Sequence, residues 1–276
     1  MFRQDYLDDV PTWYQEDTYH DLILSNDIDS LWSCTLLQQI KGWDINYFYD
    51  FNSFFKTQQA SSDASAIGVD IDFCKSKCFS NHVTMLTDSD TYNKQAINLN
   101  IIDRINRENY FDKYCGSTLL MLYALYDIPL PQTEEGQLML LAIDSTYLGY
   151  YSEYVNAQQA NKYYLCDVMG LTGLYDLLQS HARQDFERIA ITYGLKAAIT
   201  LDSDGRLKSD IDLIGISKAI GIDIQLPKDR FNKVKNYDSK QATLPDDDFI
   251  TAKEDGQIIS MALTRKNTVK YSLMRI

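Results

Sequence analysis

Leu22-Ile-Leu-Ser-Asn-Asp-Ile-Asp29 decides the fold, because a short apolar run leads directly into a turn rich in acids. Residues 22–25 predict a buried strand, and the apolar spacing of residues 31–40 predicts the helix that follows it. Strand-like runs recur at residues 45–50 and 66–72. Strands that alternate with helices are typical of a parallel sheet, so we expect an α/β fold with helices on both faces.

The rest of the chain supplies further elements. Residues 77–83 predict a short fourth strand, and residues 116–126 predict a buried helix that Pro129 and Pro131 end. Two more helical segments are expected, at residues 134–147 and 152–178. Towards the C-terminus we expect antiparallel strands at residues 249–263 and 268–275, a hairpin turn at residues 254–256, and a loop or linker at residues 228–248.

Charge divides the chain near residue 200. The whole sequence has 39 acids and 26 bases, a net charge of −13, but the last 76 residues are close to neutral. We therefore expect two domains: an α/β domain at residues 1–195, and a small α+β domain at residues 196–276.

Composition narrows the classes of protein. A net charge of −13 argues against a protein that binds long duplex DNA. The apolar runs are far shorter than a membrane span, no secretory signal is visible at the N-terminus, and five cysteines without a repeating spacing suit a reducing compartment. We expect a cytoplasmic protein that does not bind membranes, and an oligomer is compatible with these features.

Acids and an imidazole follow several of the expected strands and helices. They are Asp27, Asp29, Asp70, His82 and Asp144. Because the carboxyl ends of parallel strands meet at one edge of a sheet, these side chains are candidates for a shared site. An oxygen-rich set of this kind suits Mn²⁺ or Mg²⁺ better than Zn²⁺. Taken one by one, Asp29 could instead cap a helix, His82 could be an ordinary core or loop residue, and Asp144 could be a polar helix end.

The order of these motifs resembles that of the DHH phosphoesterase family. Residues 25–33 resemble the first motif, an Asp-x-Asp turn followed by a helix with a small Ser, and residues 67–70 resemble the second, a strand that ends in Asp. Residues 80–82, Ser-Asn-His, stand where the family has Asp-His-His. Residues 116–126 resemble the Ser-Thr-containing helix of the family, and residues 140–150 resemble its fourth motif, an apolar helix that ends in Asp.

The resemblance implies a two-metal phosphoesterase, commonly with manganese. In it, Asp70 would bridge the ions, Asp27 and Asp29 would be divided between them, and Asp144 would complete the second site. His82 would bind a metal ion or the scissile phosphate, and Asn81, Ser117 and Thr118 would bind substrate. The expected reaction is hydrolysis of phosphodiester bonds by a hydroxide that one or two ions activate. The substrate would be a short oligonucleotide, a cyclic dinucleotide or a single-strand end.

The departures from the family leave alternatives open. The triplet at residues 80–82 lacks one acid and one imidazole, and Ser25 or Asn26 stands where many relatives have His or Asp. A catalytically decayed protein that binds a nucleotide or a protein partner is one alternative. A phosphoanhydride hydrolase resembling inorganic pyrophosphatases is another. The family's glycine-rich C-terminal stretch is also missing, and Arg265, Lys266 and Lys270 are candidate phosphate ligands in its place.

Overall fold

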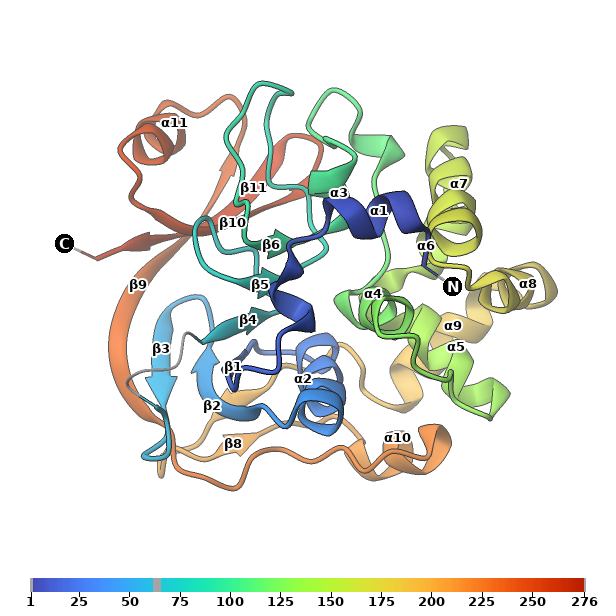
Figure 1. Cartoon of the computed structure of the whole chain (residues 1–276), viewed down its shortest axis with the longest axis horizontal. Coiled ribbons are helices and arrows are strands. Elements are labelled where there is room, and N and C mark those ends of the chain that lie inside the picture. The colour runs from blue at the N-terminus through green and yellow to red at the C-terminus, as the bar shows by residue number, and fades with distance from the viewer. Residues whose placement is uncertain (1, 62–65, 276) are drawn as a thin grey trace.

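The computed structural model describes residues 2–61 and 66–275 and shows an α/β protein built on a strongly curled sheet (Figure 1). Nine strands form this mixed sheet in the order β10-β11-β9-β3-β2-β1-β4-β5-β6. The five strands from β2 to β6 in that order are parallel and form its core. Strands β7 and β8 pair separately as a small antiparallel ribbon.

The strands have these bounds: β1 Asp21–Leu24, β2 Asp44–Tyr49, β3 Ser53–Lys56, β4 Ile67–Val69, β5 Cys78–Phe79, β6 Ala96–Ile97, β7 Thr200–Leu201, β8 Leu207–Lys208, β9 Asn232–Thr243, β10 Ile258–Arg265 and β11 Thr268–Met274. The α-helices are α1 Gln4–Asp9, α2 Ile28–Lys41, α3 Leu99–Ile102, α4 Thr118–Leu125, α5 Glu134–Ala142, α6 Tyr147–Tyr150, α7 Val155–Lys162, α8 Thr172–Ser180, α9 Arg183–Thr192, α10 Leu213–Ile220 and α11 Asp247–Glu254. Short 3₁₀ turns are η1 Thr12–Gln15, η2 Tyr110–Asp112 and η3 Ile143–Ser145, and η4 Tyr163–Val168 is a π-helix.

The parallel core confirms the predicted strands at residues 22–25, 45–50 and 66–72. Strand β1 lies in the middle, with β2 on one side and β4 on the other, and both neighbours run parallel to it. The order of the chain therefore reverses at β1. In open α/β sheets a site lies beyond the carboxyl ends of the strands at such a reversal. Asp27 follows β1 and Asp70 follows β4, so the two acids flank this point.

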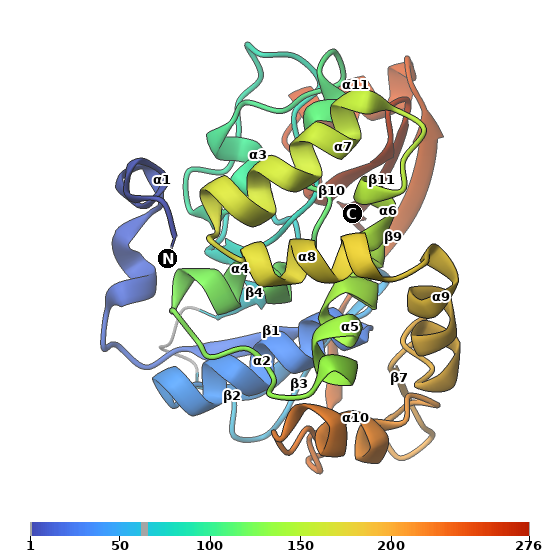
Figure 2. The ribbon, with the colours of Figure 1, turned by 90° about the vertical axis from the view of Figure 1, so that its right-hand side faces the viewer.

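Helices α2, α4 and α5 pack on one face of the parallel core and build the main hydrophobic cluster (Figure 2). The Asp27 carboxylate caps the first turn of α2, and Gly42 ends that helix with a φ of 67°, a conformation that glycine adopts without strain. All eight residues of α4 are buried, which agrees with its prediction as a buried helix. Together these helices hold the carboxyl ends of β1 and β4 in place.

The opposite face of the parallel core carries a smaller cluster. Its buried members come from β1, β2, β5, β6, the loop after β4, and α3: Ile23, Tyr49, Ile71, Phe73, Cys78, Ala96 and Ile101. Tyr237 of β9 and Ile259 of β10 pack against it. The prediction of helices on both faces therefore holds only in part, because strands and loops supply most of the cover here.

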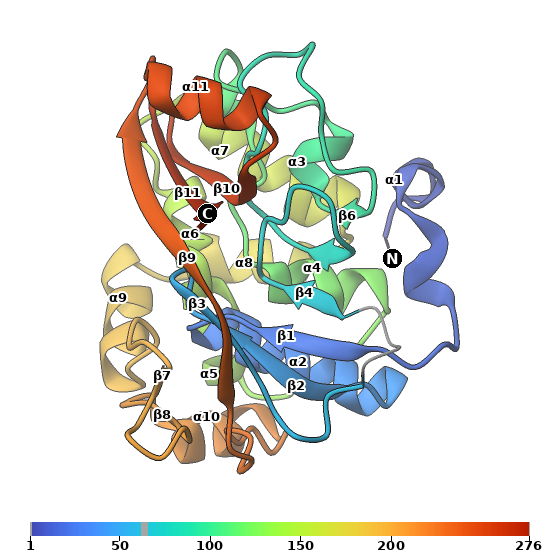
Figure 3. The ribbon, with the colours of Figure 1, turned by 90° about the vertical axis from the view of Figure 1, so that its left-hand side faces the viewer.

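Strand β9 corrects the prediction of a linker at residues 228–248. Its first half pairs with β3 and its second half pairs with β11, so it joins the parallel core to the C-terminal hairpin (Figure 3). Most of its side chains are exposed. An exposed strand of Lys, Asn and Ser has no apolar alternation, which is why its composition predicted a loop.

The C-terminal hairpin is shorter than predicted. Strands β10 and β11 pair antiparallel, as expected, and the turn between them lies at residues 265–268. Residues 247–254, however, form helix α11, which the Asp246 side chain caps at Phe249 N, so the predicted hairpin turn at residues 254–256 is wrong. Phe249 and Tyr271 pack in a separate hydrophobic cluster between α11 and the hairpin.

Two predicted helices are interrupted. The segment at residues 134–147 ends as an α-helix at Ala142, because Asp144 and Ser145 have φ values of 51° and 61°. The segment at residues 152–178 divides into α7, the π-helix η4 and α8. Within the described ranges, none of the helices combines the length and the apolar character needed to cross a bilayer.

Candidate metal centre

Three of the predicted acids converge beyond the carboxyl ends of the parallel strands. One carboxylate oxygen from each of Asp29, Asp70 and Asp144 lies within 4.8 Å of the others. We call these residues the acid triad. They come from α2, from the loop after β4 and from the turn after α5, so 115 residues of sequence separate the first from the last.

Asp29 is 1% exposed and is fixed by a helix far away in the sequence. Its Oδ2 accepts a 2.9 Å hydrogen bond from Thr118 N, and its Oδ1 accepts a 2.8 Å bond from Leu119 N. These donors are the first backbone N–H groups of α4, where a helix favours negative charge. Asp29 therefore does cap a helix, but the helix is α4 and not its own.

Asp70 is 6% exposed and follows β4 with a φ of 59°. The left-handed region is uncommon for residues other than glycine, although Asp and Asn adopt it more readily than most. The Thr118 hydroxyl donates a 2.8 Å hydrogen bond to Asp70 Oδ1. One residue at the start of α4 thus orients two carboxylates, through its backbone at Asp29 and its side chain at Asp70.

Asp144 completes the triad from the opposite side. It is exposed, and its φ of 51° ends α5 and turns its side chain back towards the sheet. Asn81 Nδ2 donates to Asp144 Oδ2 at 2.7 Å and to the Gly116 carbonyl at 2.9 Å. Asn81 is itself 5% exposed, and its Oδ1 is buried without a hydrogen-bond partner. A buried amide oxygen of this kind lies next to the triad and is free to accept a bond.

Asp27 lies beside the triad but outside it. Its Oδ1 accepts a 3.0 Å hydrogen bond from Ser30 N, which caps α2. Burial, followed by the charge of Asp144, raises the pKa of Asp27 to about 6. The side chain lines the cleft described below, so it contributes charge to the site even while it stabilises a helix.

His82 faces the same cleft and is held by a second acid. Its Nδ1 lies 2.9 Å from Asp72 Oδ2. Burial lowers the pKa of His82, but the charges of Asp72, Asp144 and Asp70 outweigh this and raise it to about 9. The imidazole is therefore a cation at neutral pH in the metal-free protein.

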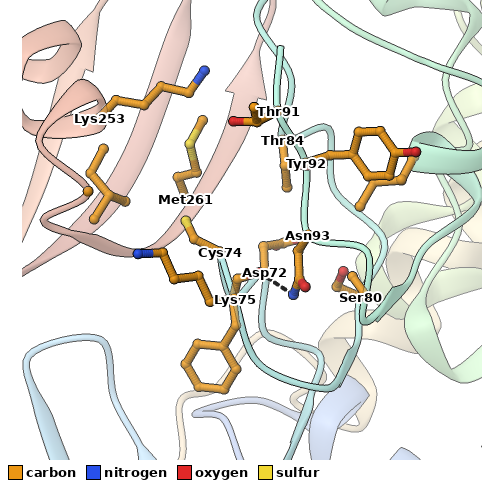
Figure 4. Close-up of a pocket in the computed structure, with 15 residues that line it drawn as sticks. Asp72, Cys74, Lys75, Ser80, Thr84, Thr91, Tyr92, Asn93, Lys253 and Met261 are labelled. Carbon is orange, nitrogen blue, oxygen red and sulfur yellow. Dashed lines mark hydrogen bonds between the residues drawn. The ribbon is translucent and has the colours of Figure 1, made fainter. Parts of the chain in front are cut away.

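Asp72 also borders a second, smaller cavity of about 130 Å³. Figure 4 shows this cavity, with Asp72, Cys74, Ser80 and Asn93 around it. Asp72 is 7% exposed, and its Oδ1 has no hydrogen-bond partner. Asp72 thus stands in the wall between the small cavity and the cleft, with its Oδ2 directed at His82.

The cleft in front of the acid centre has a volume of about 500 Å³. One wall carries Asp27, Asp70, Asp72 and His82, and the other is the sheet of β9, β10 and β11. On β11, Val269 and Tyr271 are buried against α11. Because side chains alternate along a strand, Lys270 points to the opposite side, into the cleft. Neither Arg265 nor Lys266 lines it.

Ser117 and Thr118 lie behind the acids and not in the cleft. Both are completely buried. The Ser117 hydroxyl accepts from Leu120 N and caps α4, while Thr118 holds Asp70. They therefore position the triad, whereas the sequence had placed them at the substrate. The C-terminal cleft wall, with Ser239, Gln241 and Thr264, carried no sequence signal, because its pairing is known only from the fold.

The triad fits a divalent ion on the chemistry of its donors. Burial and the charges of Asp70, Asp144 and Asp27 raise the pKa of Asp29 well above its usual range. Burial and the charges of Asp27 and Asp144 do the same for Asp70. Crowded carboxylates with raised pKa values are repelled by one another, and a cation with oxygen ligands relieves this repulsion. Asn81 Oδ1 offers one more uncharged oxygen.

Compared with protein-family models, with curated proteins and with solved structures, the chain matches none of them. The geometry of the acid centre and its cleft is therefore the basis for assigning a function.

Proposed function

We propose that this protein is a metal-dependent phosphodiesterase that hydrolyses short nucleotide substrates. The observation that carries the proposal is the convergence of Asp29, Asp70 and Asp144 at the reversal point of a parallel sheet, at the edge of a cleft. Aspartates on three separate elements meet there, and the resemblance to DHH phosphoesterases rests on the same residues.

The residues around the cleft would have different roles in such a reaction. A bound Mn²⁺ or Mg²⁺ would act as a Lewis acid that neutralises phosphate charge and lowers the pKa of water. Asp29, Asp70 and Asp144 would hold it, and Asp27 would add negative charge beside them. The His82 imidazolium, oriented by Asp72, is placed to donate a hydrogen bond to a phosphate oxygen.

The two strained aspartates support a functional centre over a purely structural one. Asp70 and Asp144 both have positive φ values, although neither is glycine. Strained conformations of this kind persist where the surrounding structure holds them, and they cluster at active sites. A structural role for these acids alone gives no reason to turn three mutually repelling carboxylates towards one point.

The cleft limits the size of the substrate. A volume of about 500 Å³ is within the range of small-molecule sites. Its charged lining is mainly acidic, and Lys240 and Lys270 are its only lysines among the described residues. A dinucleotide or the end of a short oligonucleotide fits these limits.

Mn²⁺-dependent hydrolysis of a short oligonucleotide, a cyclic dinucleotide and pyrophosphate tests the proposal. We expect cleavage of the phosphodiesters by the full-length protein, and its loss on Asp70→Asn, because Asn tolerates positive φ but removes the charge. Asp204→Asn, at an exposed turn, is the matched control. Equal activity in Asp70→Asn would overturn the assignment.

Two other outcomes would favour the alternatives. Hydrolysis of pyrophosphate alone would indicate a phosphoanhydride hydrolase. A rise in melting temperature with nucleotide, without any hydrolysis, would indicate a binding protein built on the same centre.

A further inference from the structure

The acid triad stands alone as a ligand set. In residues 2–61 and 66–275, no second group of three His, Cys, Asp or Glu ligand atoms lies within 4.8 Å of one another, and neither Asp27 nor His82 joins the first. Ions in two-metal centres lie about 3.5–4 Å apart, so a second ion could share a triad carboxylate but would need further ligands next to the triad.

Among the described residues, the groups next to the triad do not form a second ligand set. Asp27 Oδ1 caps α2 through Ser30 N. His82 contacts Asp72 through Nδ1, which leaves Nε2 free, but His82 does not join the triad oxygens in a group within 4.8 Å. The Asn81 amide presents its N–H to Asp144. Ser25, the neighbour of β1 in this region, is neutral and completely buried. Neutral hydroxyl and amide groups are weak replacements for carboxylate and imidazole ligands.

We infer that the free protein holds a single divalent ion, ligated by Asp29, Asp70 and Asp144, and that His82 is not one of its ligands. The Asp72–His82 pair lies in the lining of the same cleft as Asp70. Asn81, which donates to Asp144, also has a buried Oδ1 without a hydrogen-bond partner. This stoichiometry rests on the metal-dependent function proposed above and specifies it.

Calorimetric titration of the full-length, metal-free protein with Mn²⁺ measures the number of ions. We expect one ion per chain, and an electron paramagnetic resonance spectrum of an isolated Mn²⁺ in place of an exchange-coupled pair. Two ions per chain with a coupled spectrum would overturn the inference but leave the phosphodiesterase proposal standing. No binding at all would overturn both.

Two variants separate the ligands from their neighbours. His82→Gln removes the imidazole, and we expect it still to bind one ion with little change in affinity, whereas a two-ion centre would fall from two ions to one. Asp70→Asn removes a triad carboxylate, and we expect it to lose binding. Asp204→Asn serves as the control for both. Loss of the ion in folded His82→Gln, with circular dichroism unchanged, would show that His82 is a ligand and would overturn the inference.

Discussion

Asn81 Nδ2 donates a 2.7 Å hydrogen bond to Asp144 Oδ2 and thereby joins the loop after β5 to the turn after α5. The bond places a neutral donor against an acid at the edge of the triad. It also ties together two segments separated by 63 residues. Asn81 therefore stabilises the arrangement of the acids in the metal-free protein.

Asn81→Asp should destabilise the metal-free protein and make it more dependent on metal. The variant exchanges a donor for a carboxylate next to Asp144, and repulsion between close carboxylates raises the free energy of the folded state. Without metal, we expect the melting temperature to fall by about 5 °C. Addition of Mn²⁺ should raise the melting temperature of the variant by more than it raises that of the wild type. Differential scanning calorimetry with and without Mn²⁺ measures both. Asn81→Ala, which adds no charge, is the control and should show the ordinary Mn²⁺ increment; an unchanged melting temperature in Asn81→Asp would contradict the prediction.

The stability of the metal-free protein should fall as pH rises. The pKa of Asp27 is raised to about 6, and those of Asp29 and Asp70 are raised as well, so above about pH 4 the folded state holds protons that the unfolded state has released. The pKa of His82 is raised to about 9, so stability should continue to decrease as pH rises towards that value. A group with a raised folded-state pKa stabilises the fold at low pH and loses that contribution as pH rises through the folded value.

Thermal melts between pH 5 and pH 9 test this dependence. We expect a decreasing melting temperature in the metal-free protein and a stabilisation by Mn²⁺ that grows with pH, because ligands must be deprotonated to bind. Asp70→Asn should show a shallower slope. A rising melting temperature over this range would show that the carboxylates do not repel one another in the folded state.

Gly68→Ala should destabilise the strand that leads to Asp70. An added Cβ would lie 2.6 Å from the Phe73 ring and 3.2 Å from Cys78 Cβ, both in a packed cluster. We expect a loss of about 1–3 kcal/mol in the free energy of unfolding, measured by urea denaturation. Gly173→Ala in α8 is the matched control, because its Cβ meets nothing within 4 Å. In the double variant, Phe73→Leu should recover part of the stability that Gly68→Ala loses. Equal stability of Gly68→Ala and Gly173→Ala would contradict the close contact at Gly68.

Lys270→Gln should weaken substrate binding without affecting the metal. Lys270 points into the cleft from the wall opposite the acids, where it can meet a phosphate. Loss of one hydrogen bond to a charged group corresponds to an increase in KM of about tenfold, with kcat and Mn²⁺ affinity unchanged. Lys266→Gln is the control, since the Lys266 ammonium lies over the Phe111 ring and outside the cleft. An equal KM in Lys270→Gln and Lys266→Gln would show that Lys270 does not contact the substrate.

The parallel core could be predicted because its strands are short apolar runs and helices α2 and α4 have clear caps. Recognition of short apolar runs as strands also placed Asp70 at a strand end. The sequence could not show that the Asp29 carboxylate caps α4, because Asp29 and Thr118 are 89 residues apart and only tertiary packing brings Thr118 N to the carboxylate. Nor could it show that Thr118 faces Asp70 and not the cleft.

The C-terminal wall could not be predicted because its signals are not local. Strand β9 has exposed polar side chains on both faces, so neither apolar alternation nor turn residues mark it as a strand. Asp246, Asp247 and Asp248 resemble a loop, but Asp246 caps helix α11 and the other two form its first turn. The orientation of Lys270 depends on the register of β11 with β9, which pairs Lys270 with Gln241.

Strand β9 has a mechanical consequence for the cleft. Because one unbroken strand is hydrogen-bonded to β3 of the parallel core and to β11 of the facing wall, the two walls share a backbone ladder. A hinge that swung them apart would have to bend this strand or break its ladder. On the proposed function, a substrate would enter an already formed opening, and the width of that opening, more than a closing motion, would select what reaches the acids.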